Sequence, residues 1–399
     1  MKKKKVVLAY SGGLDTTYCA LYLSRELGYE VHAITVNTGG YSLLEISEIE
    51  KKAKHLGVYS YTCVDSIKEY YDTCIKYLLF GNVLKNNTYP LSVSAERSIQ
   101  AKRIAEYAKE VGADAICHGS TGAGNDQVRF DVTFQIIAPE MEIITPIRDK
   151  KLSREEEISF LKKHGVDMDF EKAKYSINQG LWGTSVGGKE TLTSRDYLPE
   201  EAFPSQVTKK EAERHELIFK KGELVGLDDQ VFDHPSKAIL ALEKEASAFG
   251  IGRDIHVGDT IIGIKGRVGF EASSAMVAIK AHHLLEKHTL SKNQLMIKDQ
   301  LSAQYGNWLH EALFLDPVMR DIESLLTSTQ KRVSGKVLVT FYPYRFVLNG
   351  IESPYDLMAN EFAQYGEMNN AWSGADVKGF SKIVANALNI YYQTGQHES

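Results

Sequence analysis

The feature that most constrains the fold is a short apolar run followed by a glycine turn near the amino end. Residues 6–8 (Val-Val-Leu) are typical of a buried parallel strand, and residues 18–27 have the pattern of a helix that ends at Gly28. Between them, Gly12 and Gly13 allow a ligand to approach the backbone, and the first N–H groups of the helix are free to bind an anion. This segment therefore predicts an α/β fold with a phosphate site.

Asp15 lies inside this predicted phosphate site. Its carboxylate would repel phosphate unless a cation lay between the two groups. We therefore predict Mg²⁺ between Asp15 and the phosphates of a nucleotide. The glycine spacing differs from both GxxxxGK[ST] and GxGxxG, which argues against a P-loop NTPase and a dinucleotide-binding fold.

The run Ser11-Gly12-Gly13-Leu14-Asp15-Thr16 resembles the pyrophosphate loop of the ATP-pyrophosphatase family. This resemblance implies that ATP is split into AMP and pyrophosphate while a carbonyl or ureido oxygen is activated. The family includes argininosuccinate, GMP, NAD and asparagine synthetases and tRNA thiolation enzymes, and the loop alone does not distinguish them.

Composition narrows these choices. With 399 residues the chain is long enough for two domains, and its net charge of -5 gives no reason to expect a nucleic acid partner. The four cysteines form no CxxC pair of the kind that thiolation enzymes use. No apolar run is as long as a membrane span and no signal peptide is visible, so we expect no membrane partner and a cytoplasmic protein.

A second informative stretch follows the strand predicted at residues 113–118. Its loop, residues 119–130, contains three glycines and the side chains of Thr121, Asn125, Asp126 and Arg129. Arginine pairs with a carboxylate in a two-pronged fashion, and aspartate pairs with an ammonium group. This set therefore suits a zwitterionic amino acid, although a glycine turn with a surface Asp–Arg pair would look the same in isolation.

The sequence HGSTGAGNDQVRF at residues 118–130 closely matches the signature of argininosuccinate synthases, and the resemblance runs through both halves of the chain. It implies a ligase that condenses citrulline with aspartate at the expense of ATP. It also implies a homotetramer with a carboxyl-terminal arm. By this resemblance, the ATP-binding residues are Ala9, Tyr10, Ser11, Gly12, Gly13, Leu14, Asp15, Thr16, Thr17, Val36 and Gly119.

The same resemblance assigns residues to the two amino acids. Thr121, Asn125 and Asp126 would bind aspartate, and citrulline would be held by Tyr89, Ser94, Asn125, Arg129, Ser176 and Ser185. Asp15, Asp126 and Arg129 would be the residues most directly involved in catalysis. The sequence departs from the family at Gly258, where a citrulline-binding glutamate is usual, and at Phe270, where a tyrosine is usual. We expect the neighbouring Asp259 to take the role of the missing carboxylate.

Alternating strands and helices predict a doubly wound parallel sheet for residues 1–165, like that of adenine nucleotide alpha hydrolases. We expect an α+β synthetase and multimerisation domain over residues 166–372. An apolar stripe at helical spacing that includes Val377 and Tyr391 predicts a helix within residues 373–399, which either folds back on its own core or crosses to a neighbouring subunit. The resemblance to argininosuccinate synthases implies the second, a carboxyl-terminal oligomerisation helix.

Two alternative functions remain open. The first alternative is a synthetase of the same class that acts on another carbonyl or on a modified ureido acceptor. The second is a regulator that binds ATP without chemistry. Release of pyrophosphate that requires both citrulline and aspartate would exclude the regulator.

Overall fold

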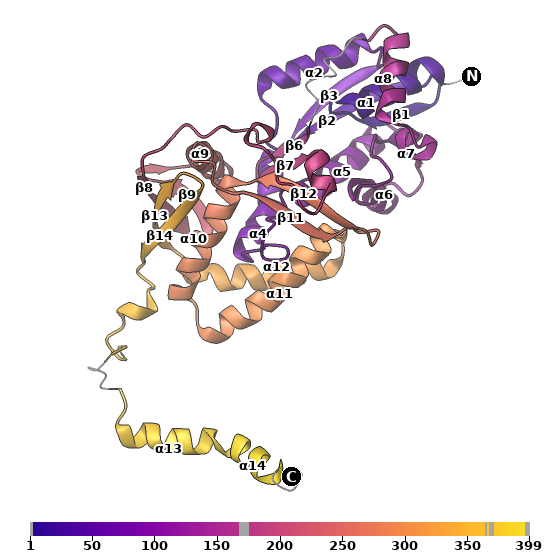
Figure 1. The fold of residues 1–399 in the computed structure, drawn as a ribbon. Helices are drawn as coiled ribbons and strands as arrows, with labels where there is room; N and C mark the ends of the chain where they lie inside the picture. Colours follow the sequence, from indigo (N-terminus) through magenta and orange to yellow (C-terminus); the bar gives the residue numbers. More distant parts are fainter. Residues whose placement is uncertain (1–2, 167–174, 364, 367–370, 396–399) are drawn as a thin grey trace.

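The computed structural model describes residues 3–166, 175–363, 365–366 and 371–395. The amino-terminal half is built on a five-stranded parallel sheet of strand order β3-β2-β1-β4-β5 (Figure 1). Its strands are β1 (Lys5–Ala9), β2 (Glu30–Asn37), β3 (Ser60–Asp65), β4 (Ala115–Cys117) and β5 (Glu142–Ile144). Because the strand order reverses between β1 and β4, the loops that follow these two strands border one crevice. The predicted doubly wound sheet is confirmed.

Helices cover both faces of this sheet because the side chains of β1 alternate between them. Val6 and Leu8 pack in one apolar cluster with residues of α1 and α2, whereas Val7 packs in another with residues of α5 and α6. The helices of this half are α1 (Leu14–Leu21), α2 (Leu43–His55), α3 (Ile67–Tyr70), α4 (Lys76–Phe80), α5 (Ser92–Glu110), α6 (Asp126–Ile137), α7 (Pro146–Lys150) and α8 (Arg154–Lys163).

Helix α1 begins at Leu14, earlier than the predicted start at residue 18, and a π-helical turn continues it to Glu26. The reason is that Gly13 has extended backbone angles and serves as the N-cap, so the helix starts directly after the second glycine. Asp15 is consequently a residue of the first helical turn, where the helix dipole favours a negative charge.

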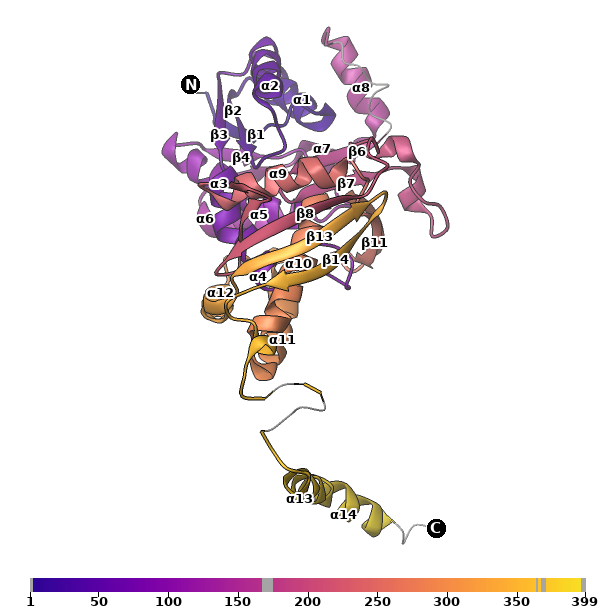
Figure 2. The ribbon, with the colours of Figure 1, turned by 90° about the vertical axis from the view of Figure 1, so that its left-hand side faces the viewer.

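The carboxyl-terminal half contains two antiparallel sheets (Figure 2). One consists of β10 (Gln230–Val231), β9 (Glu223–Leu227), β8 (Glu213–Lys220), β13 (Gly335–Tyr342) and β14 (Arg345–Glu352), and the other of β11 (Arg253–Asp259), β12 (Lys265–Glu271), β7 (Gly183–Gly187) and β6 (Ser176–Gly180). Helices α9 (Pro235–Ser247), α10 (Ser273–Thr289), α11 (Lys292–His310) and α12 (Pro317–Thr329) accompany them.

The largest apolar core joins residues from both halves of the sequence. Tyr70, Phe80 and Leu91 come from the amino-terminal half, yet they pack in one buried cluster with residues such as Leu217 and Leu285. The segment of α3, α4 and the start of α5 therefore anchors the parallel sheet to the second half. The division at residues 165 and 166 stays a prediction, and residues 167–174 beside it lie outside the described residues.

The chain ends in helices α13 (Gly374–Val384) and α14 (Asn386–Thr394), which stand well away from the rest of the molecule in both views (Figures 1 and 2). Their apolar side chains are exposed, including Phe380 at 69% and Tyr391 at 72%. Within the described part of the chain, no helix combines the length and apolar character needed to cross a membrane.

Candidate functional site

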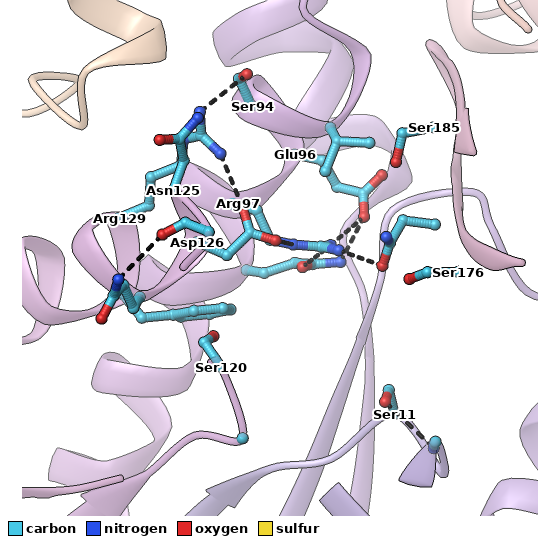
Figure 3. Close-up of a pocket in the computed structure, with 18 of the residues that line it drawn as sticks. Ser11, Ser94, Glu96, Arg97, Ser120, Asn125, Asp126, Arg129, Ser176 and Ser185 are labelled. Atoms are coloured by element: carbon cyan, nitrogen blue, oxygen red, sulfur yellow. Dashed lines mark hydrogen bonds and ion pairs between the residues drawn. The ribbon is translucent and has the colours of Figure 1, made fainter. Parts of the chain in front are cut away.

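A pocket of about 950 Å³ lies where the loops after β1 and β4 meet residues of β6, β7 and β11. Ligand sites in open α/β sheets occupy this kind of crevice. The pocket brings together all the residues predicted to bind the two amino acids: Tyr89, Ser94, Thr121, Asn125, Asp126, Arg129, Ser176 and Ser185. Serines from the second half of the chain thus face a loop of the parallel sheet across a shared space (Figure 3).

Most of the predicted nucleotide-binding residues line the same pocket. They are Ala9, Tyr10, Ser11, Gly13, Leu14, Asp15, Thr16, Val36 and Gly119. Gly12 and Thr17 are not among the lining residues. The Thr17 hydroxyl donates to the Gly13 carbonyl oxygen at 2.6 Å, and Lys52 Nζ donates to the Gly12 carbonyl oxygen at 2.5 Å. Gly12 and Thr17 therefore take part in hydrogen bonds that hold the conformation of the loop, and they do not face the pocket.

The two glycine turns are in direct contact. A Cβ atom added to Gly119 would lie 3.2 Å from both the carbonyl carbon and the Cβ of Asp15. The second turn is held in place because His118 Nε2 lies 2.9 Å from Asp131 Oδ1, and the Ser120 N–H donates to His118 Nδ1 at 3.2 Å. A ligand at the start of α1 would therefore touch both turns.

Asp15 faces a second carboxyl group that the sequence reasoning did not identify. Glu157, on α8, is only 3% exposed, and its Oε2 has no hydrogen-bond partner among the described residues. Burial and the nearby charge of Asp15 raise the pKa of Glu157 to about 8, and burial also raises the pKa of Asp15. Of the two carboxyl groups only Asp15 lines the pocket, so Asp15 is the one that a cation beside a bound nucleotide would meet.

Asp126 lies between two guanidinium groups. Arg97 Nε donates to Asp126 Oδ2 at 3.0 Å, and Arg129 Nη1 donates to Asp126 Oδ1 at 2.8 Å (Figure 3). Burial by itself would raise the pKa of Asp126, but the two arginines outweigh burial and hold that pKa below its usual value. Asp126 is therefore a fixed anion, rigidly placed at the start of α6.

Arg129 is oriented by residues from both halves of the chain. Its Nη2 donates to Ser94 Oγ at 3.2 Å and to the His310 carbonyl oxygen at 3.1 Å. Burial and the charge of Arg129 lower the pKa of His310 to about 3, so the imidazole is neutral. Its Nε2 is buried and has no partner among the described residues.

Of the two positions that depart from the family signature, Gly258 lines the pocket and Phe270 does not. A Cβ at Gly258 would lie 2.5 Å from His256 Nε2, so the His256 ring occupies the space that a side chain at position 258 would need. Phe270 is fully buried beside Tyr89, with ring centroids 5.4 Å apart. Asp259 is exposed and pairs with Lys265 at 2.6 Å, which does not support the expectation that it replaces the missing carboxylate.

Sequence reasoning missed Glu96, Arg97, Glu157 and His310. Each lies on a helix, where a charged or polar residue is more often a solvated one. The Glu96-Arg97 pair carried the strongest signal, because it lies two and three residues after Ser94, which the family resemblance assigns to citrulline.

A parallel sheet whose first strand leads into a glycine turn, in contact with a second glycine turn after β4, is the architecture of a nucleotide-binding α/β domain. Comparison with known families agrees. Residues 5–167 match the model described as "Arginosuccinate synthase N-terminal HUP domain", and residues 175–391 match the corresponding C-terminal domain. The chain belongs to the argininosuccinate synthase family, which are C–N bond-forming ligases.

Curated relatives support this assignment over nearly the full length. An argininosuccinate synthase of Methanocaldococcus jannaschii is 37% identical over 365 residues, which are 90% of this chain and 91% of the relative. One of Dictyoglomus thermophilum is 35% identical over 400 residues, 99% of each chain. One of Staphylococcus aureus is 35% identical over 370 residues, 91% of each chain.

Proposed function

We propose that this chain condenses citrulline with aspartate to form argininosuccinate while ATP is cleaved to AMP and pyrophosphate. The observation that carries the proposal is the contact between the two glycine turns, because a phosphate bound at the first turn and an amino acid bound at the second would then share one pocket. Membership of the family favours this reaction over a different acceptor or a regulator without chemistry.

The nucleotide is assigned to the first turn. The N-cap Gly13 has no side-chain cap, so the first N–H groups of α1 are free to bind the β- and γ-phosphates. Ser11 Oγ and Thr16 Oγ1 lie 3.2 Å apart at the pocket surface and add hydroxyl donors. These preformed donors stabilise the charge of the departing pyrophosphate.

Asp15 would hold a Mg²⁺ ion that accompanies ATP. A bound Mg²⁺ supplies positive charge that offsets the charge of the phosphate oxygens. The fit rests on Asp15, a carboxyl group that lines the pocket in the first turn of α1, beside the proposed phosphate site.

The amino acids are assigned to the rest of the pocket. Citrulline is held by Tyr89, Ser94, Asn125, Arg129, Ser176 and Ser185, and aspartate by Thr121, Asn125 and Asp126. The ureido oxygen attacks the α-phosphorus and pyrophosphate leaves. The aspartate amine then attacks the ureido carbon, and AMP departs with the former ureido oxygen. Most of the rate acceleration comes from holding these groups in reacting positions.

Pyrophosphate release in four mixtures tests this function: ATP alone, ATP with citrulline, ATP with aspartate, and all three. Turnover that requires all three supports the condensation. Binding of ATP without turnover in any mixture would support a regulator instead.

A cytoplasmic homotetramer completes the proposal. The four cysteines are unpaired, and three of them are buried, as expected in a reducing compartment. The exposed apolar faces of α13 and α14 would be covered by neighbouring subunits.

A further inference from the structure

One buried carboxyl group in the pocket has an oxygen atom without a partner. Glu96, on α5, lines the pocket and is 2% exposed. Its Oε1 accepts hydrogen bonds from Arg97 Nη1 at 2.7 Å and from Gln100 Nε2 at 2.9 Å. Its Oε2 is buried and has no hydrogen-bond partner among the described residues. Leaving a buried acceptor unpaired is unfavourable, so a ligand that donates an N–H group to Oε2 would gain affinity.

The fold leaves room for this carboxyl group at one glycine. A Cβ atom added to Gly180, on β6, would lie 1.8 Å from Glu96 Oε2. The carboxyl group therefore fills the space that any other residue at position 180 would occupy. This contact brings the unpaired oxygen of α5 next to a strand from the other half of the chain.

The location of Glu96 indicates which substrate it meets. Arg97 separates it from Asp126, because Arg97 donates to Glu96 on one side and to Asp126 on the other. Figure 3 shows Glu96 on the side of Ser176 and Ser185, whereas Asp126, which is assigned to aspartate alone, lies across Arg97. The serines belong to the site assigned to the ureido acceptor. The acceptor is thus the substrate closest to the unpaired oxygen.

We propose that Glu96 binds the α-ammonium group of the ureido acceptor and thereby selects acceptors that are α-amino acids. This inference rests on the proposed function and names the carboxylate that binds the amino-acid end of the ureido acceptor. Burial raises the pKa of Glu96 to about 7 in the free chain. An ammonium group next to Glu96 favours the carboxylate form.

The test compares citrulline with 5-ureidopentanoic acid, which is citrulline without its α-amino group. Steady-state pyrophosphate release and calorimetric binding are measured for both acceptors, with wild type and Glu96→Gln. A charge-assisted hydrogen bond predicts that Glu96→Gln raises the KM and the Kd for citrulline roughly 10- to 100-fold. The constants for 5-ureidopentanoic acid and for ATP should change less than about threefold, because neither ligand carries the ammonium group.

Two further variants make the test specific. Glu106→Gln removes a carboxylate from the same helix, where it pairs with Arg103 at 2.9 Å, and should leave both acceptors unaffected. Gly180→Ala places a methyl group against Glu96 Oε2 and should reproduce the selective loss of citrulline affinity.

Three results would overturn the inference. If wild type used citrulline and 5-ureidopentanoic acid equally well, the protein would not recognise the ammonium group. Equal losses for both acceptors in Glu96→Gln would mean that Glu96 only supports the fold. A loss confined to aspartate would assign Glu96 to the other substrate. Failure of the proposed function is distinguishable, because wild type would then release no pyrophosphate, while the binding comparison would still decide the role of Glu96.

Discussion

Substituting Gly119 by alanine tests the contact between the two glycine turns. The added Cβ would lie 3.2 Å from two atoms of Asp15 and 3.3 Å from the Thr16 nitrogen. Carbon atoms pack best at about 3.5–4.0 Å, so the start of α1 must move by a few tenths of an ångström. Overpacking of this kind costs about 1–3 kcal/mol. If the displaced N–H groups lose the same free energy of binding to the nucleotide, ATP affinity drops roughly 5- to 150-fold.

Calorimetric titration with a non-hydrolysable ATP analogue, together with thermal unfolding, measures this effect. Gly122→Ala is a matched control in the same loop, because its Cβ would meet only Arg148 Cγ at an ordinary 3.6 Å. The Gly119 variant should lose ATP affinity while the control keeps it. A Gly119 variant that is less stable but binds ATP as tightly as wild type would refute the reasoning, since the contact would then serve packing alone.

Three further predictions follow from the site and the arm. Asp126→Asn should lower kcat/KM for aspartate at least about 100-fold with little change in the Kd of ATP, and equal losses in both would mean that Asp126 supports the fold. Because the folded-state pKa of Glu96 is raised to about 7, its contribution to stability is fully present below the pKa of an unfolded glutamate and is lost as the pH rises through 7. The Tm of ligand-free Glu96→Gln minus the Tm of wild type should therefore increase between pH 5 and pH 8. A difference that does not change with pH would contradict the raised pKa. Removal of residues 373–399 should reduce the mass measured by light scattering below that of a tetramer, whereas an unchanged tetramer would show that the arm is not needed for assembly.

Local sequence predicted the parts of the site that lie on turns. Gly13 and Gly119 mark where the backbone can approach a ligand, and the alternation of strands and helices predicts that the turns after the strands share one edge of the sheet. The start of α1 was predicted too late, because the N-cap role of Gly13 depends on its extended backbone and not on a capping side chain. Turn chemistry is therefore readable from sequence, while the first residue of a helix is less so.

The remaining site residues depend on contacts between distant segments. Arg97 is tied to Asp126 and to Asn178, which are 29 and 81 residues away. Glu157 matters only because α8 packs beside the start of α1, where the rings of Tyr18 and Phe160 lie 4.6 Å apart. Glu156 is marked by its capping box with Ser153, but no motif in the sequence marks Glu157 as the residue that faces Asp15. Such residues become visible only when the fold brings their partners together.

Transfer of oxygen from the acceptor to AMP tests the central claim most directly. Citrulline labelled with ¹⁸O in its ureido group is incubated with ATP, aspartate and the protein, and the AMP is analysed by mass spectrometry. The account predicts one ¹⁸O atom in the phosphate of each AMP formed, because the ureido oxygen attacks the α-phosphorus. AMP without the label would contradict it.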